Sequence, residues 1–257
     1  MVIFILSTKA EFLKIRRSNA FWLTMCGAAF IPLVNAIKLI GRPDVFESKL
    51  GNDPWAIFIN DNWAVAASFL LPVYVILVIS LVVQIEYGNN TWKQVYTTPR
   101  SYADIFFSKF LVINFLIIFC FIFFTIFIVA SGSAVSLLNH NYEFLSKPVP
   151  WGHLIVFTEK MYGSILAMIT IQYWLSMQIK NFITPIGLGM VLIIGGYMIR
   201  QWEHIAYYPY MHPLLVYFKN PGLKFGSACN ALLNSALEGL LFLSGGFYSF
   251  CVRNEKG

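Results

Sequence analysis

The feature that most constrains this chain is the stretch 110–130, which consists almost entirely of Phe, Ile, Leu and Val and contains no charged residue. A helix that crosses a bilayer needs about 20 consecutive apolar residues, and this run is long enough. Several other runs approach that length. Only 12% of the chain is charged and its mean hydropathy is +0.67, whereas soluble domains carry about 25% charged residues. The runs do not alternate as barrel strands do. The sequence therefore predicts an all-α polytopic membrane protein.

Six apolar segments are predicted to cross the membrane, and they lie at residues 21–40, 63–85, 110–130, 156–179, 182–199 and 227–251. Residues 2–18 are predicted to form an amphipathic helix on the membrane surface, with Leu6 and Leu13 on its apolar face. A frayed extension of the first span is the alternative. Two X-Pro corners, at Pro209 and Pro213, interrupt residues 200–226 and indicate short outer half-helices, re-entrant or interfacial. We expect residues 1–257 to form a single transmembrane permease domain.

Turn-forming residues separate the first two apolar segments. Residues 41–62 are predicted to be a polar loop on the outer side. Trp55 and Trp63 are expected at the membrane interface, where an amphipathic ring suits headgroup depth. The glycines of segment 182–199 allow close approach of a neighbouring helix, so this segment is expected to lie centrally in the bundle.

Lysine and arginine set the expected orientation. Six spans place both termini on one side, and that side carries ten of the 18 basic residues, clustered near the ends of spans. Because basic residues are retained on the cytoplasmic side, we expect both termini in the cytoplasm and the protein in the plasma or inner membrane. The same rule accounts for the net charge of +6. No basic surface interleaved with aromatic residues indicates nucleic acid as a partner.

Sequence motifs for catalysis or metal binding are missing. The four cysteines lie in or at the ends of apolar runs without CxxC spacing, and the four histidines match no metal-ligand pattern. There is no GxSxG nucleophile motif. There is also no GxxxxGK[ST] motif, so the chain is not expected to hydrolyse ATP by a P-loop mechanism of its own. We expect no metal, no bound cofactor and no enzymatic activity in this chain by itself.

Glu238 lies inside the last predicted span, where a carboxylate costs about 2–4 kcal/mol unless it is paired, protonated or faces a polar cavity. Asn230 and Asn234 share its helix face. This polar stripe is interpreted as lining a substrate path or an interface with a second permease. A structural hydrogen bond between helices is the alternative. An ion- or proton-coupled secondary transporter that uses Glu238 is the alternative function.

The polar segment 86–109 connects the second and third predicted spans on the cytoplasmic side. Trp92 and Tyr96 share one helix face with Val95, an apolar surface that a solvated loop does not need. Pro99 ends that helix. Ser101 and Asp104 have the spacing of a capping box, so a new helix is predicted to start there. The Lys109 amine is expected to reach back to water where this helix enters the membrane. An ordinary solvated loop is the alternative.

These features resemble the ABC-2 type permeases, particularly the branch associated with bacitracin and lantibiotic immunity. An acid at the end of the second span, a Gly/Asn-Thr/Trp turn, a Pro-Arg-Ser step and a lysine at the start of the third span carry the resemblance. In this chain they are Glu86, Gly88, Asn89, Thr91, Trp92, Pro99, Arg100, Ser101 and Lys109. The helix that precedes the first span resembles the corresponding helix of that family through Glu11, Lys14, Arg17 and Ser18.

The resemblance implies a fold of the ABC-2 or type V exporter kind and an ATP-driven export function. Two permeases, identical or paralogous, would form a dimer docked on two ATPase subunits, which would bind the ATP and Mg. The cargo of the family includes peptides, antibiotics and lipids, so an amphiphilic substrate is expected. The residues implied in coupling to the ATPase are Glu86, Asn89, Thr91, Trp92, Tyr96, Pro99 and Arg100. Membrane lipid is the remaining expected partner.

Overall fold

The computed structural model describes residues 2–16, 18–43, 53–88, 100–139, 142–218 and 228–252, and these parts of the chain are helical or irregular, without a strand. The first half consists of α1 (Val2–Ile15), α2 (Asn19–Gly41), α4 (Pro54–Val65), the π-helix η1 (Ala66–Leu70), α5 (Leu71–Gly88) and α7 (Tyr102–Leu138). The second half consists of α8 (Trp151–Ser164), α9 (Leu166–Gln178), α10 (Ile183–Met198), the 3-10 helices η2 (Ile205–Tyr207) and η3 (Pro209–Met211), α11 (His212–Phe218) and α12 (Ala228–Val252).

Four of the described helices are long and apolar enough to cross a membrane: 19–41, the continuous helix 54–88, 102–138 and 230–252. Helices α8 and α9 form a fifth candidate if they are counted as one span bent by 41°. Helix α10 is apolar but has only 16 residues. The predicted all-helical membrane fold is confirmed, whereas the count of six spans stays a prediction, because it needs α10 to cross as well.

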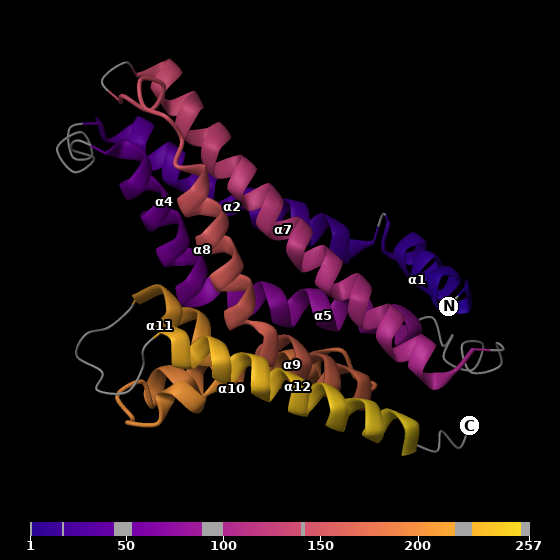
Figure 1. The fold of residues 1–257 in the computed structure, drawn as a ribbon. Coiled ribbons are helices and arrows are strands. Elements are labelled where there is room, and N and C mark those ends of the chain that lie inside the picture. The colour runs from indigo at the N-terminus through magenta and orange to yellow at the C-terminus, as the bar shows by residue number, and fades with distance from the viewer. Residues whose placement is uncertain are drawn as a thin grey trace.

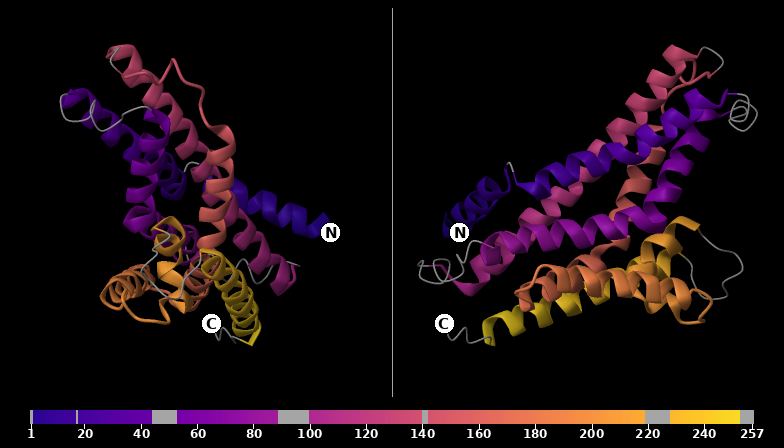
Figure 2. Two further views of the ribbon diagram at one scale, coloured as in Figure 1. Left: turned by 60° about the vertical axis from the view of Figure 1, so that its left-hand side comes forward. Right: turned by 180° about the vertical axis from the view of Figure 1, so that it is seen from behind.

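Helix α7 runs the length of the molecule and α2 lies along it (Figure 1). At 1.5 Å per residue, the 37 residues of α7 extend about 55 Å, well beyond a hydrocarbon core of about 30 Å. Helices α5, α9 and α12 form the neighbouring layer, with α9 between the other two. The start of α1, the end of α5, the start of α7 and the end of α12 lie at the same end of the molecule (Figure 2).

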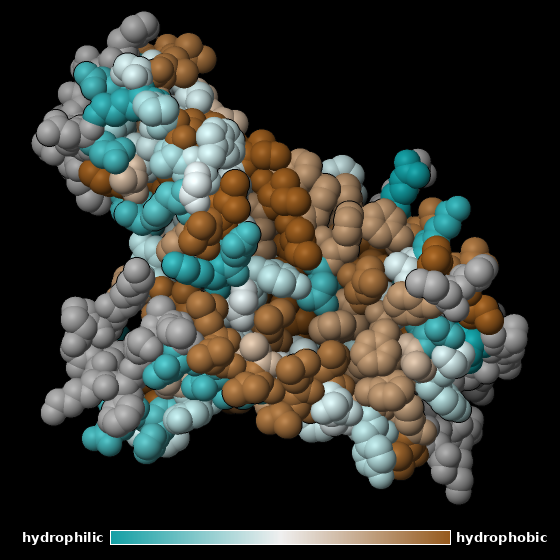
Figure 3. Space-filling view, viewed as in Figure 1, coloured by the Kyte–Doolittle hydropathy of each residue, from teal (hydrophilic) through white to brown (hydrophobic). Residues whose placement is uncertain are grey.

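Apolar side chains gather over the middle of the molecule, and most hydrophilic ones gather toward its two ends (Figure 3). Exposed apolar residues occur along the sides of the membrane-length helices, for example Ile37 at 66% exposure on α2 and Leu241 at 71% on α12. A side surface of this kind suits acyl chains rather than water. The surface therefore agrees with the polytopic membrane fold.

The prediction of a polar outer loop up to residue 62 was wrong, because a helix begins at Pro54. Pro54 occupies the first turn, where its missing N–H costs nothing, and the Asp53 side chain accepts a hydrogen bond from the Ala56 N–H at 3.2 Å. Trp55 and Trp63 do not face the surroundings of the protein as interfacial rings would, because each is only 1% exposed. Trp55 Nε1 donates to the carbonyl oxygen of Phe144 at 2.9 Å, so these rings belong to the protein core.

Close packing of α10 was predicted from its glycines and holds at two of them. A Cβ atom on Gly189 would lie 2.8 Å from Gln172 Oε1 and 2.8 Å from Ile76 Cδ1, and one on Gly196 would meet Met211 at 2.8 Å. Real Cβ atoms do not approach that closely, so α10 touches its neighbours here only because it carries glycine. Nothing lies within 4 Å of such a Cβ on Gly187. One face of α10 is therefore packed, but the other is open, with Val191 64% exposed. The prediction that this segment lies centrally in the bundle was wrong, because α10 packs through one face alone.

The segment that follows α10 has the broken helical form predicted from its X-Pro corners. Helices η2, η3 and α11 are short, and Pro209 and Pro213 lie in their first turns. The rest of the predicted half-helix segment, from residue 219 to 226, lies outside the described residues. The position of this segment at the outer interface stays a prediction.

Candidate functional site

Four charged side chains from three helices meet where α1 crosses the ends of α5 and α7; we call them the charge cluster. Lys109 Nζ of α7 lies 2.6 Å from Glu11 Oε2 of α1 and 2.7 Å from Glu86 Oε2 of α5. Lys14 Nζ of α1 lies 2.5 Å from Glu11 Oε1 and 3.0 Å from Glu86 Oε1. Each carboxylate therefore contacts both ammonium groups, and the four formal charges sum to zero.

The charge cluster is buried except at one corner. Glu11, Glu86 and Lys109 are 5%, 1% and 2% exposed, while Lys14 reaches the surface. Taking a charge out of water costs several kcal/mol, and mutual attraction offsets this only with good geometry and full pairing. The reciprocal contacts supply that pairing. Removing one member would leave a buried charge without compensation, so the cluster holds α1, α5 and α7 in one fixed arrangement.

The pKa values of the two α1 members agree with a charged cluster. Burial raises the pKa of Glu11, but the ammonium groups of Lys109 and Lys14 outweigh burial, so that the pKa lies below its ordinary value. Burial lowers the pKa of Lys14, and the carboxylates of Glu86 and Glu11 outweigh it in the opposite direction. Both side chains are therefore ionised at neutral pH.

The prediction for Lys109 was wrong, because its amine does not reach back to water. Helix α7 begins as predicted, with a capping box in which Ser101 Oγ accepts from the Asp104 N–H at 3.0 Å and the Asp104 carboxylate accepts from the Ser101 N–H at 3.3 Å. Two turns further on, α1 covers the helix and supplies Glu11. The lysine is buried because its partner comes from a segment about a hundred residues earlier in the chain.

Helix α1 turns its polar face toward the protein. Ser7, Glu11 and Ile15 are buried, whereas Leu6 and Leu13 are each 58% exposed. The predicted apolar face is thus free to contact lipid, as expected of a helix lying on a membrane. The chain turns between α1 and α2, and Ser18 Oγ accepts from the Phe21 N–H at 3.4 Å. Two separate helices replace the alternative of a frayed extension of the first span.

The other residues implied in coupling are only partly visible. Arg100 is half-buried and directly precedes the Ser101 cap. Asn89, Thr91, Trp92, Tyr96 and Pro99 lie outside the described residues, as does Arg17 of the predicted interfacial helix. The charge cluster lies at the two ends of this coupling segment, because Glu86 is in the last turn of α5 and Lys109 is in the third turn of α7.

The polar stripe of α12 is divided between two environments. Asn230 is exposed, whereas Asn234 Nδ2 donates to the carbonyl oxygen of Ala206 at 2.8 Å. Glu238 is 19% exposed at its side chain, and its Oε2 lies 3.9 Å from Nε2 of the fully buried His212. Burial lowers the pKa of His212 to about 4, although its bond to the Ala206 carbonyl raises it. His212 is therefore neutral at pH 7, and this contact is not an ion pair there.

Sequence reasoning missed His212 and a second buried polar group. His212 begins α11 and packs inward, where it is fully buried. Gln172 Nε2 donates to the Pro185 carbonyl at 3.0 Å, and Tyr210 Oη donates to Gln172 Oε1 at 3.1 Å. This network joins α9, α10 and η3. Its members are 13 and 38 residues from Gln172 in the chain, so no local spacing reveals it. Among the described residues, no group of three or more His, Cys, Asp or Glu side chains is arranged to hold a metal ion.

Membrane-length helices and a closed charge cluster define the class as a polytopic helical membrane protein. A family model described as "ABC-2 family transporter protein" matches residues 7–196, well over half of the chain. The chain therefore belongs to the ABC-2 transporter family, and it is the multi-pass membrane permease of an ATP-binding cassette (ABC) transporter. The matched region contains the whole charge cluster and ends before the polar stripe of α12. No curated protein and no solved structure matched the chain.

Permeases of ABC transporters lack an ATPase domain, bind no cofactor themselves and partner with ATPase subunits. The charge cluster links α1, α5 and α7, so a displacement of one of these helices would be passed to the other two.

Proposed function

We propose that this permease moves an amphiphilic substrate, such as a peptide, an antibiotic or a lipid-like molecule, out of the cell or the membrane. A separate ATPase subunit would drive it by docking on residues 86–109 at the cytoplasmic side, where both termini also lie. The permease would work as a dimer with an identical or paralogous copy, and immunity against a membrane-active antibiotic is one role that fits.

The charge cluster is the observation that carries this proposal. Two of its buried members, Glu86 and Lys109, are the first and last residues of the coupling segment 86–109, and their side chains contact each other at 2.7 Å. A displacement of the segment is therefore passed to α5 and α7 together, and through Glu11 to α1. ATP binding shifts the permease between conformations only if the ATPase contacts them with different free energies. A rigid junction behind the docking segment would convert such a difference into helix movement.

The test measures ATP hydrolysis by the permease–ATPase complex in lipid vesicles. Truncation of a tryptophan at the centre of an interface costs about 2 kcal/mol or more, about a thirtyfold loss of affinity. We therefore expect Trp92→Ala to reduce the stimulation of the ATPase by the permease about tenfold or more at a subunit concentration close to the Kd of the unchanged pair. Trp22→Ala is the control, because Trp22 is 61% exposed on the side of α2. Equal stimulation by both variants would remove residues 86–109 as the docking site.

A second candidate function rests on Glu238. No described group donates a hydrogen bond to its buried Oε2 atom, and His212 is the polar side chain beside it. An ion- or proton-coupled carrier would need such a carboxylate in a span. It would transport in vesicles without any ATPase and lose that activity in Glu238→Gln. Transport that requires the ATPase and survives Glu238→Gln would leave Glu238 with a structural role between α12 and α11.

A further inference from the structure

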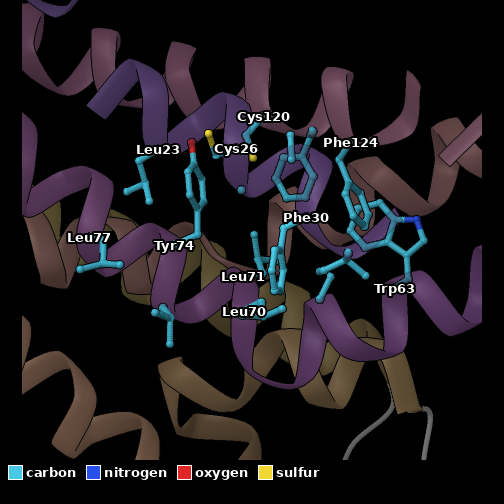
Figure 4. Close-up of a pocket in the computed structure, with 16 residues that line it drawn as sticks. Leu23, Cys26, Phe30, Trp63, Leu70, Leu71, Tyr74, Leu77, Cys120 and Phe124 are labelled. Atoms are coloured by element: carbon cyan, nitrogen blue, oxygen red, sulfur yellow. The ribbon is translucent and has the colours of Figure 1, made fainter. Parts of the chain in front are cut away.

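An apolar cavity of about 270 Å³ lies between α2, η1 with the start of α5, and α7 (Figure 4). Side chains from all three walls face it, and none of the lining residues is charged. The lining residues used below are Cys26, Gly27, Phe30, Ala66, Tyr74 and Cys120. The cavity belongs neither to the charge cluster nor to the polar stripe of α12.

The cavity lies at the middle of three membrane-length helices. Its lining residues come from 23–31, 63–77 and 120–124, and these ranges surround the centres of the candidate spans 19–41, 54–88 and 102–138. Because the cavity is near the centre of all three candidate spans, we expect it to lie within the hydrocarbon core. Molecules at that depth are acyl chains, because water and headgroups are excluded from the hydrocarbon core.

The lining offers few polar groups to water, and its one hydroxyl is already hydrogen-bonded within the protein. The Tyr74 hydroxyl donates to the Leu116 carbonyl at 3.3 Å and shares a hydrogen bond with Thr24 Oγ1 at 3.0 Å. The remaining lining is aliphatic, aromatic or thiol, and among the described residues the indole N–H of Trp63 is its one buried polar group without a hydrogen-bond partner. Apolar cavities stay dry and bind apolar molecules, and a cavity of about 150 Å³ already accepts benzene. This one is nearly twice that size.

The cavity has an open side toward the surroundings of the protein. Phe30 is 58% exposed and Cys26 is also exposed, so the lining of α2 continues onto the outer surface of that helix. Neither residue has a charged neighbour in the lining. A chain can therefore enter from the side, without crossing a polar barrier.

We propose that this cavity binds one acyl chain of a membrane phospholipid, which would fill the space between α2 and the π-helix η1. A π-helix widens one turn of a helix and occurs often at functional sites, and here Ala66 and Leu70 of η1 form one wall. The site depends on the chain lying in a bilayer, but not on the proposed docking of an ATPase. Its test therefore succeeds or fails separately from the test of coupling.

Gly27 offers a way to fill the cavity with little strain. A Cβ atom there would meet only Tyr74 Cδ2, at 3.6 Å, which is an ordinary contact. Gly27→Ala should leave the cavity open, whereas Gly27→Leu should place its branched end inside. Displacing two or three methylenes at about 0.8 kcal/mol each exceeds the about 1.4 kcal/mol that equals a factor of ten in affinity. We therefore expect at least about a tenfold loss of chain binding in Gly27→Leu.

The experiment uses the full chain in phosphatidylcholine vesicles that contain a phosphatidylcholine with a photoreactive diazirine near the end of one acyl chain. After illumination, mass spectrometry locates the adducts. We expect adducts on the cavity residues Tyr74 and Cys120, assigned to single residues by fragmentation of the labelled peptides, in the unchanged protein and in Gly27→Ala. Gly27→Leu should lose them and keep adducts on the exposed residues Ile118 and Ile122. If Gly27→Leu does not fold, Ala66→Leu fills the cavity from the opposite wall.

Two results would overturn the proposal. One is labelling that is confined to the exposed residues in every variant, which would mean that lipid only surrounds the protein. The other is cavity labelling that is unchanged by a filling variant of unaltered melting temperature, which would mean that the labelled space is not this cavity.

Discussion

The charge of Lys109 helps to fix how three helices of this membrane protein pack together. Its ammonium group is buried between two carboxylates at 2.6 and 2.7 Å, and Lys14 balances the second negative charge. A buried pair is not strong support for stability as such, because well-packed apolar residues often replace it without loss. What the cluster supplies is a fixed geometry: α1, α5 and α7 meet in one arrangement in which every buried charge has a partner.

We predict that Lys109→Met destabilises the protein by about 3–5 kcal/mol, because it leaves two buried carboxylates with Lys14 alone. The double variant Glu86→Gln with Lys109→Met restores charge balance and should cost clearly less than the single one. Melting temperatures of the purified variants in one detergent measure both. A double variant that is less stable than Lys109→Met would show that charge balance is not what the cluster provides.

At the residue scale, the sequence indicated which residues matter better than where they lie. Glu11, Lys14, Glu86 and Lys109 were all selected through a family resemblance, yet their mutual contacts were not predicted. The reason is physical: Lys109 alone near a membrane boundary is best explained by an amine that reaches water. Only the return of α1 across α7 supplies a carboxylate, and no local spacing encodes that return.

At the break between α8 and α9, backbone groups that lose their partners within the helix are hydrogen-bonded by a side chain of α12. Helices α8 and α9 meet at a bend of 41°. In an unbroken helix the Ala167 N–H would donate to the carbonyl four residues earlier, but here it donates to Ser235 Oγ of α12 at 3.2 Å. The same hydroxyl donates to the Ser164 carbonyl at 3.0 Å. One buried serine therefore satisfies both sides of the break.

We predict that Ser235→Ala destabilises the protein by about 1–3 kcal/mol, since it leaves a buried N–H and a buried carbonyl without partners. Ser244→Ala is the matched control on the same helix, because the exposed Ser244 donates only to Leu241 of its own helix. Thermal unfolding of both variants in the same detergent gives the comparison. Equal stability of the two would mean that water or backbone adjustment replaces the Ser235 bonds.

Helix boundaries were predicted well where the composition changes sharply along the chain. They were predicted poorly where contacts with distant residues determine where a helix begins. The predicted first span, 21–40, and last span, 227–251, differ from α2 and α12 by one or two residues. The start at Pro54 was missed, since Asp53 and Pro54 suit a turn as well as a helix cap. Helix α4 persists because Trp55 inserts against Phe144, 89 residues later in the chain.

At the scale of the whole molecule, composition alone was sufficient for the fold class. Long uncharged runs form helices in lipid, because a helix pairs the backbone N–H and C=O groups within the segment itself. The short helix α10 and the bent pair α8–α9 explain why the number of spans is harder to predict than the class. The ABC-2 family was predicted and is confirmed, whereas the immunity branch, the cargo and the orientation stay proposals, because they depend on partners outside the chain.

The central claim is that force enters through the segment between α5 and α7 from an ATPase on the cytoplasmic side. The most direct measurement places a photo-crosslinking amino acid at position 92 in intact cells that contain the ATPase subunit, with position 202 as the control. Trp202 is 51% exposed and follows the last residue of α10, a helix whose end lies away from the two termini (Figure 1). We expect position 92 to crosslink to a P-loop ATPase and position 202 not to. An ATPase adduct at position 202 but not at 92, or labelling of position 92 by a reagent confined to the outside, would contradict the claim.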